Sequence, residues 1–325
     1  MNAGVPPSAD DPVLDALLAA LARRAPDPTW SVAQLRADLE AKAAGLPLPP
    51  GVTAQAGLLA ALPVQQIRPY AAVGSGVVLY LPGGGYISGS AMTHRALAAR
   101  IAVASHIRGV VLEYPLAPEH PFPAAIQATV SAYLALLEEG YAPHDIVIGG
   151  DSAGGGLTAA TLLALRERQV AQPAGAFLLS PWLDLTFSSD AWRGGASRDP
   201  MVNKRLLRRA AAWYLNGASA SDPLASPVFA DLRDLPPLLV QSAGRDPLRD
   251  EARRFAEKAR HAGVETQFEC SEDMVHVWQA FAPRLPQSVC AIDRIGAWIA
   301  DTLPGRSGET ERSRRHRCGS ARNTG

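Results

Sequence analysis

A serine in a glycine-rich turn is the residue of this chain best suited to nucleophilic chemistry. Ser152 lies in Gly150-Asp151-Ser152-Ala153-Gly154, a G-x-S-x-G pattern between an apolar run at 146–149 and a helical stretch. A serine hydroxyl is a weak nucleophile unless it is held within reach of a base, and small flanking residues permit the sharp turn that presents it. The pattern also occurs by chance in glycine-rich turns between a strand and a helix. We predict Ser152 as the nucleophile.

A second glycine-rich segment offers backbone N–H groups to a developing negative charge. Gly83, Gly84 and Gly85 follow a strand-like run at 76–81. Acyl transfer needs amide donors aimed at an oxyanion, and glycines let the backbone approach a substrate closely. We therefore assign Gly83 and Gly84, with the amide of Ala153, to an oxyanion hole. A flexible loop and a phosphate cradle are the alternatives, and the cradle is disfavoured because no GK[ST] or Rossmann spacing follows.

An acid and a base follow the serine in the order that a Ser-Asp-His arrangement can use. Asp246 comes after the apolar run at 237–242, and His276 comes after the last β-rich run at 265–269. The acid would accept the Nδ1 proton of the histidine and stabilise the imidazolium. Asp250 is the competing carboxylate, but its position favours a role at the start of the next helix. We predict His276 as the general base and Asp246 as the residue that orients it.

Three aromatic residues are candidates for the wall of a substrate pocket. Tyr86 follows the triple glycine, Trp213 lies in a helical segment, and Trp278 is two residues beyond His276. Large aromatic side chains serve equally well as core or as pocket lining, and their positions in the sequence do not separate the two roles. We place Tyr86, Trp213 and Trp278 in the pocket.

Alternating β-rich and helical runs are expected to position these groups. From about residue 63 the chain shows the βαβ rhythm of a parallel sheet covered on both faces. The rhythm breaks at about 187–225, which indicates an inserted helical segment. Residues 51–304 are thus expected to form one catalytic domain with a cap insertion. Expected strands lie at 76–81, 109–114, 146–149, 175–180, 237–242 and 265–269, and expected helices at 94–105, 124–139, 154–168, 249–262 and 291–303.

The two ends of the chain differ from this pattern. Residues 1–50 contain an amphipathic helix beginning after Asp11 and a second helix whose capping box pairs Ser31 with Gln34. We expect this segment to form part of a helical cap. Residues 305–325 are rich in arginine and almost free of apolar residues, which predicts a disordered basic tail.

Charge and composition narrow the classes of partner. Lys plus Arg and Asp plus Glu each number 31, so the chain has no net field to attract nucleic acid or an anionic membrane. No apolar run is long enough to span a bilayer, and no secretory signal pattern begins the sequence, which favours the cytoplasm. Ligand-spaced His, Cys and Asp clusters are also missing, so we expect neither a metal nor a cofactor. A small neutral substrate fits this composition best.

Several motifs together resemble the bacterial hormone-sensitive-lipase-like family of α/β-hydrolase esterases, marked by the sequence GDSAG. The resemblance covers about residues 60–300 and implies an α/β-hydrolase fold with a mostly parallel sheet and a helical cap. One departure is Pro82, which stands where the family usually has histidine and so puts the anchoring of the glycine loop in question. The motifs appear in family order as Gly83-Gly84-Gly85, Leu116-Ala117-Pro118-Glu119, Gly150-Asp151-Ser152-Ala153-Gly154-Gly155 and Ser180-Pro181-Trp182-Leu183-Asp184.

The resemblance implies a serine carboxylesterase that hydrolyses short- to medium-chain esters through an acyl-enzyme. Lactones, acetyl esters, amides and carbamates are alternative substrates for the same three residues. A binding protein without catalysis is a more distant alternative, and the presence of His276 stands against it. The family also implies a homodimer formed through the late strand and the last helix.

Overall fold

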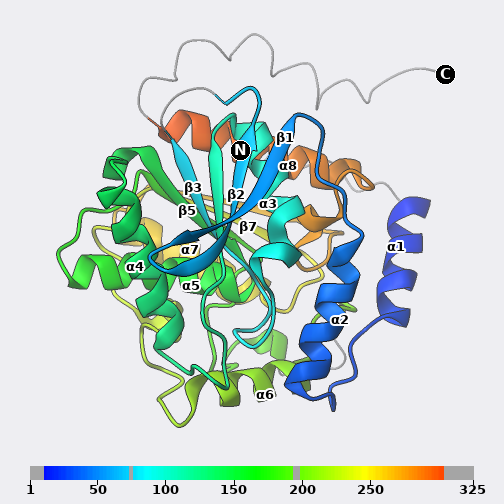
Figure 1. Cartoon of the computed structure of the whole chain (residues 1–325). Helices are drawn as coiled ribbons and strands as arrows, with labels where there is room; N and C mark the ends of the chain where they lie inside the picture. The colour runs from blue at the N-terminus through cyan, green and yellow to red at the C-terminus, as the bar shows by residue number, and fades with distance from the viewer. Residues whose placement is uncertain (1–10, 73–75, 193–197, 304–325) are drawn as a thin grey trace.

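A central eight-stranded sheet organises the molecule, for which a computed structural model describes residues 11–72, 76–192 and 198–303 (Figure 1). The strand order is β1-β2-β4-β3-β5-β6-β7-β8. The pairs from β4 onward in this order are parallel, whereas β1 pairs antiparallel with β2, and β2 with β4. The strands are β1 (Val52–Leu59), β2 (Leu62–Pro69), β3 (Val77–Leu81), β4 (Arg108–Leu112), β5 (Ile146–Asp151), β6 (Gly175–Leu179), β7 (Leu238–Ala243) and β8 (Thr266–Ser271). This arrangement confirms the predicted α/β-hydrolase fold.

The two faces of the sheet bury different side chains of the same strands. In β3, Val77, Leu79 and Leu81 join the larger hydrophobic core, while Val78 and Tyr80 point into the other. Alternation with a period of two is what a pleated strand imposes, and a strand covered on both faces reads as a continuous apolar run. The central strands are therefore rigid supports for the loops at their ends.

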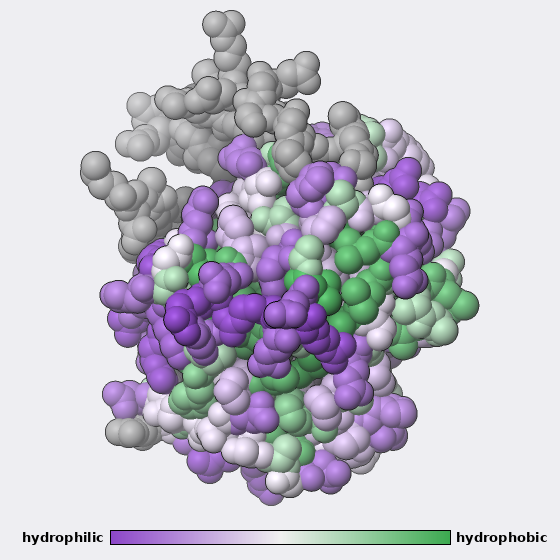
Figure 2. Space-filling model, turned by 90° about the vertical axis from the view of Figure 1, so that its left-hand side faces the viewer, coloured by the Kyte–Doolittle hydropathy of each residue, from purple (hydrophilic) through white to green (hydrophobic). Residues whose placement is uncertain are grey.

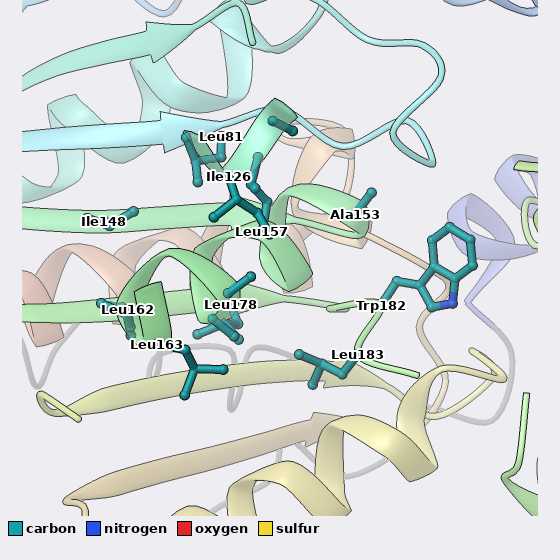
Figure 3. Packing of buried hydrophobic residues seen from close by; sticks show 14 of the residues in the cluster. Leu81, Ile126, Ile148, Ala153, Leu157, Leu162, Leu163, Leu178, Trp182 and Leu183 are labelled. Atoms are coloured by element: carbon teal, nitrogen blue, oxygen red, sulfur yellow. The ribbon is translucent and has the colours of Figure 1, made fainter. Parts of the chain in front are cut away.

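Helices cover both faces of the sheet. The larger core is covered by α4 (Ala124–Glu138), α5 (Ala153–Glu167) and α7 (Arg249–His261), and the smaller one by α3 (Ala91–Ser105) and α8 (Pro286–Thr302). Figure 3 shows Leu157 of α5 beside Leu81 and Ile126, with Leu162 and Leu163 close to Leu178 of β6. This packing fixes α5, and with it the turn that carries Ser152.

A glycine permits the closest approach between α5 and the sheet. A Cβ atom on Gly154 would lie 2.0 Å from the carbonyl oxygen of Leu81 and 2.7 Å from that of Pro82. No side chain can be accommodated at such distances, so the first turn of α5 is held directly against the end of β3. The serine turn and the glycine loop consequently share one end of the sheet.

The antiparallel hairpin of β1 and β2 was not predicted from the sequence. Its two turn residues, Ala60 and Ala61, both have positive φ angles, of 50° and 63°. Hairpin turns of this kind are usually recognised by Asn-Gly or Asp-Gly, and two alanines give no such signal. β1 also lacks a clear alternation of buried and exposed residues. The hairpin extends the sheet beyond β4.

The helices before the sheet begin where the sequence predicted. Asp11 caps α1 (Pro12–Arg23) by accepting from the amides of Val13 and Leu14. Ser31 and Gln34 form a complete capping box at the start of α2 (Val32–Ala44). Leu14 packs against Trp278 in a third core cluster, and Leu35 joins the large core. Residues 11–50 are thus packed onto the rest of the molecule.

The interval at 187–225 contains α6 (Lys204–Leu215), which lies at the same end of the molecule as the lower part of α2 in Figure 1. Arg209 of α6 donates a hydrogen bond to the carbonyl oxygen of Pro28, in the loop between α1 and α2. This contact supports our proposal that residues 1–50 and the insertion together form the cap. The predicted tail at 305–325 lies outside the described residues.

The surface is mixed in polarity. On the face in Figure 2 a band of hydrophilic residues runs between smaller hydrophobic patches. Among the described helices, none combines the length and apolar character needed to cross a bilayer.

Candidate active site

Ser152 lies in a strained turn between β5 and α5. Its φ and ψ angles are 54° and −121°, a conformation that residues with a side chain seldom adopt. Three hydrogen bonds hold the turn: the Ser152 amide donates to Leu179 O at 2.8 Å, and the amides of Gly156 and Trp182 donate to Ser152 O at 3.1 and 2.9 Å. This is the geometry that presents a serine hydroxyl at the end of an α/β sheet.

The structure brings the predicted acid and base into direct contact. His276 Nδ1 lies 2.7 Å from Asp246 Oδ2, and both residues are buried. The second oxygen of Asp246 accepts from the amide of Leu248 at 2.9 Å, which fixes the carboxylate. The competing Asp250 instead lies in the first turn of α7, 3.6 Å from Arg249. Asp246 therefore occupies the position from which an acid can orient His276.

The turn of Ser152 and the residue after His276 are both held by the segment from the end of β6 to Trp182. The hydroxyl of Ser180 accepts from the amide of Val277 at 3.1 Å, while Leu179 and Trp182 bond to Ser152 as described above. Within the described part of the chain, Ser152 Oγ makes no hydrogen bond with His276. Such catalytic hydrogen bonds are often long without substrate and tighten when it binds.

Three carboxylates surround the imidazole of His276. Burial alone would lower the pKa of His276, but the negative charges of Asp246, Asp199 and Asp151 outweigh it and raise this pKa above 6.5. These surroundings stabilise the imidazolium more than those of an ordinary histidine do, and the imidazolium is the form that a general base reaches after taking a proton. Asp199 belongs to the insertion and was not singled out from the sequence.

Gly83 is not available as the oxyanion donor that we predicted. Its amide N–H points to Asp151 Oδ1 at 3.1 Å and to His94 Nε2 at 3.2 Å. Sequence reasoning missed this because it cannot show which amide of a glycine run is already bonded. Among the described residues, the amides of Gly84 and Gly85 have no such partner, and their φ angles of 125° and 65° favour glycine. The glycine loop thus still presents two N–H groups.

The carboxylate of Asp151 anchors the glycine loop. The hydroxyl of Tyr80 donates to Asp151 Oδ1 at 2.7 Å, and His94 Nε2 lies 3.4 Å from Asp151 Oδ2. Burial would raise the pKa of Asp151, but His94 and the Tyr80 hydroxyl more than offset it and lower this pKa. The ionised carboxylate is therefore the stable form.

The loop is also held at Pro82, where the family usually has histidine. Tyr114 donates its hydroxyl hydrogen to Pro82 O at 2.6 Å. A histidine from α3, His94, contacts the next residue, Gly83. The anchoring that Pro82 cannot supply through a side chain is therefore provided by Tyr114, Asp151 and His94.

The three predicted pocket residues have different surroundings. Trp278 is 1% exposed and shares a core cluster with Leu14, Met274 and Leu285, surroundings that suit core packing. The preceding residue, Val277, has a φ of 49° and begins the short helical turn that contains Trp278.

Tyr86 and Trp213 both lie at α6. The ring of Tyr86 stacks on Tyr214 of α6 with centroids 3.8 Å apart, and it is buried. Trp213 is half-buried beneath the guanidinium of Arg209, 4.6 Å from the ring centroid. Their place in a pocket remains a prediction.

A surface hollow of about 560 Å³ lies between α2 and the segment that follows β4. Arg36 of α2 lines the hollow. Its guanidinium donates to Ile87 O and Ala117 O and forms a bidentate ion pair with Glu119. The residues that line the hollow do not include Ser152, Tyr86, Trp213 or Trp278. They include Arg36, Glu40, Leu62, Gly89, Ser90, Glu113, Tyr114, Leu116, Glu119 and His120.

A parallel sheet with a serine turn after its central strand and an Asp-His pair on later loops defines the α/β-hydrolase class. Comparison with known proteins agrees with this class. Residues 78–280 match the family model described as alpha/beta hydrolase fold.

Individual relatives share much of their length with this chain. An acetyl-hydrolase of Streptomyces hygroscopicus is 39% identical over 78% of this chain and 84% of its own. An esterase of Acinetobacter venetianus is 38% identical over 66% of this chain and 72% of its own. A crystal structure of an esterase from the bacterial hormone-sensitive lipase family superposes with a TM-score of 0.87 and 42% identity, covering 91% of this chain and 100% of that one. The chain belongs to the α/β-hydrolase family, on its bacterial hormone-sensitive-lipase-like branch.

Proposed function

We propose that this protein is a serine carboxylesterase that hydrolyses esters with short acyl groups. The observation that carries the proposal is the 2.7 Å contact between His276 Nδ1 and Asp246 Oδ2, at the same end of the sheet as the strained turn of Ser152. The names of the relatives, acetyl-hydrolase and esterase, support ester hydrolysis and a small acyl group.

The proposed reaction has two halves. Ser152 Oγ attacks the ester carbonyl while His276 Nε2 takes its proton, and Asp246 stabilises the imidazolium. His276 then gives this proton to the leaving alcohol. In the second half, water activated by His276 attacks the acyl-enzyme, and the carboxylic acid leaves. No further group is needed to balance either step.

The oxyanion of each tetrahedral intermediate is proposed to accept from the amides of Gly84, Gly85 and Ala153. The close approach of Gly154 to Leu81 and Pro82 supports this, because it places the start of α5 beside the glycine loop. The N-terminus of α5 adds its favourable dipole to the same place. Gly85 replaces Gly83 in this assignment because the Gly83 amide already has partners.

Acyl-chain length is the first property to measure. With p-nitrophenyl acetate, butyrate and octanoate, we expect the highest kcat/KM for acetate or butyrate and a decline of about tenfold or more for octanoate. The matched p-nitroacetanilide is expected to react far more slowly, since an amide needs its nitrogen protonated. Equal rates for octanoate and acetate would refute the short-chain preference, and a faster anilide would favour an amidase.

The pH dependence follows from the environment of His276. The base must be neutral to accept a proton, so kcat/KM is expected to fall as the pH drops through the pKa of His276. Because Asp246, Asp199 and Asp151 raise that pKa, the midpoint of the fall is expected above pH 6.5. A profile of kcat/KM from pH 4 to 9 checks this. A midpoint well below 6.5 would show that the carboxylates do not govern the base.

A further inference from the structure

A cap residue contacts the main chain of the histidine that we propose as the base. Asp199 is 3% exposed and precedes α6, lying four residues before Asn203, the N-cap of that helix. Its Oδ2 atom accepts a hydrogen bond from the amide of His276. Its Oδ1 atom accepts from the amide of Met201 at 2.8 Å. Asp199 therefore joins the cap insertion to the loop after β8.

We propose that Asp199 is a positioning residue that holds His276 in place from the insertion. The inference rests on the proposed function, because it assigns His276 the role of base. A buried carboxylate with its two oxygens on two separate amides fixes both segments at once. Movement of the start of α6 would then move the contact with His276.

Three carboxylates act on the imidazole of His276. His276 faces Asp246 from the loop after β7, Asp151 from the end of β5 and Asp199 from the insertion. Burial, followed by the negative charge of Asp246, raises the pKa of Asp199 above 3.8. Asp246 orients the imidazole through its side chain, and Asp199 holds the same residue through its backbone. His276 is therefore held by two acids from separate segments: Asp246 comes from the loop after β7, and Asp199 comes from the insertion.

Asp199→Asn is the direct test because it changes charge and one hydrogen-bond group but hardly any volume. Asparagine has a single acceptor oxygen, so it cannot serve the amides of both Met201 and His276. We expect kcat/KM at the optimum to fall about tenfold or more. Loss of the negative charge should also move the acid limb of the profile down by about one pH unit.

Asp222→Asn is the matched control. Its Oδ1 accepts from the amide of Leu224, two residues ahead, just as Asp199 does from Met201, but Asp222 has no contact with His276. Asp222 lies in the same insertion as Asp199, and Asp222→Asn also removes one negative charge. We expect neither its rate nor its pH profile to change.

An NMR titration of the His276 imidazole gives a readout that needs no substrate. Its pKa should be lower in Asp199→Asn than in wild type and unchanged in Asp222→Asn. If Asp199→Asn does not fold, Asp199→Ser replaces it, because a serine hydroxyl can still accept from Met201 but is too short to reach His276. An unchanged imidazole titration, or a loss of rate with no change in the pH profile, would overturn the inference.

Failure of the proposed function can be distinguished from failure of the role proposed for Asp199. If wild-type protein hydrolyses no ester while the imidazole titration still responds to Asp199→Asn, the contact is real and the esterase proposal is wrong. If wild type is active and Asp199→Asn equals it at every pH, only the role of Asp199 is wrong.

Discussion

Replacing Ser152 with alanine is expected to reduce kcat/KM for p-nitrophenyl butyrate by about 10⁴- to 10⁶-fold. Ser152 Oγ is the one protein atom that the proposed mechanism bonds to the acyl carbon, so its loss leaves only the oxyanion hole and binding. The side chain is small and the turn is held by backbone bonds to Leu179 and Trp182, so the fold should persist.

The control for this change is Ser221→Ala, at an exposed serine of the insertion. It should retain the full rate, and both variants should keep the wild-type circular dichroism spectrum. Residual activity within tenfold of wild type in Ser152→Ala would show that another group attacks the ester.

Replacing Asp246 with asparagine is expected to reduce kcat by about 10⁴-fold. Asparagine fits the same space, but its amide can hold the imidazole of His276 in the wrong tautomer, with the proton on the nitrogen that must accept one. The pKa of His276 should also fall, because its hydrogen-bonded carboxylate is lost.

Asp250→Asn is the comparison for Asp246→Asn, since it removes a carboxylate four residues away that lies near Arg249 rather than His276. Steady-state kinetics of the two variants should differ by about three to four orders of magnitude. A similar loss of kcat in both variants would mean that the rate depends on negative charge near the site and not on the contact between Asp246 and His276.

Most of the fold could be predicted from patterns that lie within short stretches of the sequence. The caps at Asp11 and Ser31 use side chains within three residues of the amides that they satisfy, so a short stretch of sequence suffices to predict them. The apolar runs of β3, β5, β6 and β7 are buried on both faces, which gives each a recognisable composition. The last helix begins at Pro286, five residues before the predicted start.

Contacts between distant segments could not be predicted in the same way. Gly83 is replaced as an oxyanion donor because its amide contacts Asp151 of β5 and His94 of α3. The spacing of these residues in the sequence does not indicate that they come together. Asp199 contacts His276 across 77 residues of sequence, which no local pattern indicates. The Asp246–His276 pair was predictable because the fold fixes the order in which these residues leave the sheet.

Mass spectrometry of the protein after reaction with phenylmethylsulfonyl fluoride tests most directly the claim that Ser152 is an activated nucleophile. We expect one sulfonyl group per chain, located on the peptide that contains Ser152, formed in step with the loss of esterase activity and missing in Ser152→Ala. Inactivation that tracks a label on a different serine, or full activity in protein labelled at Ser152, would contradict the account.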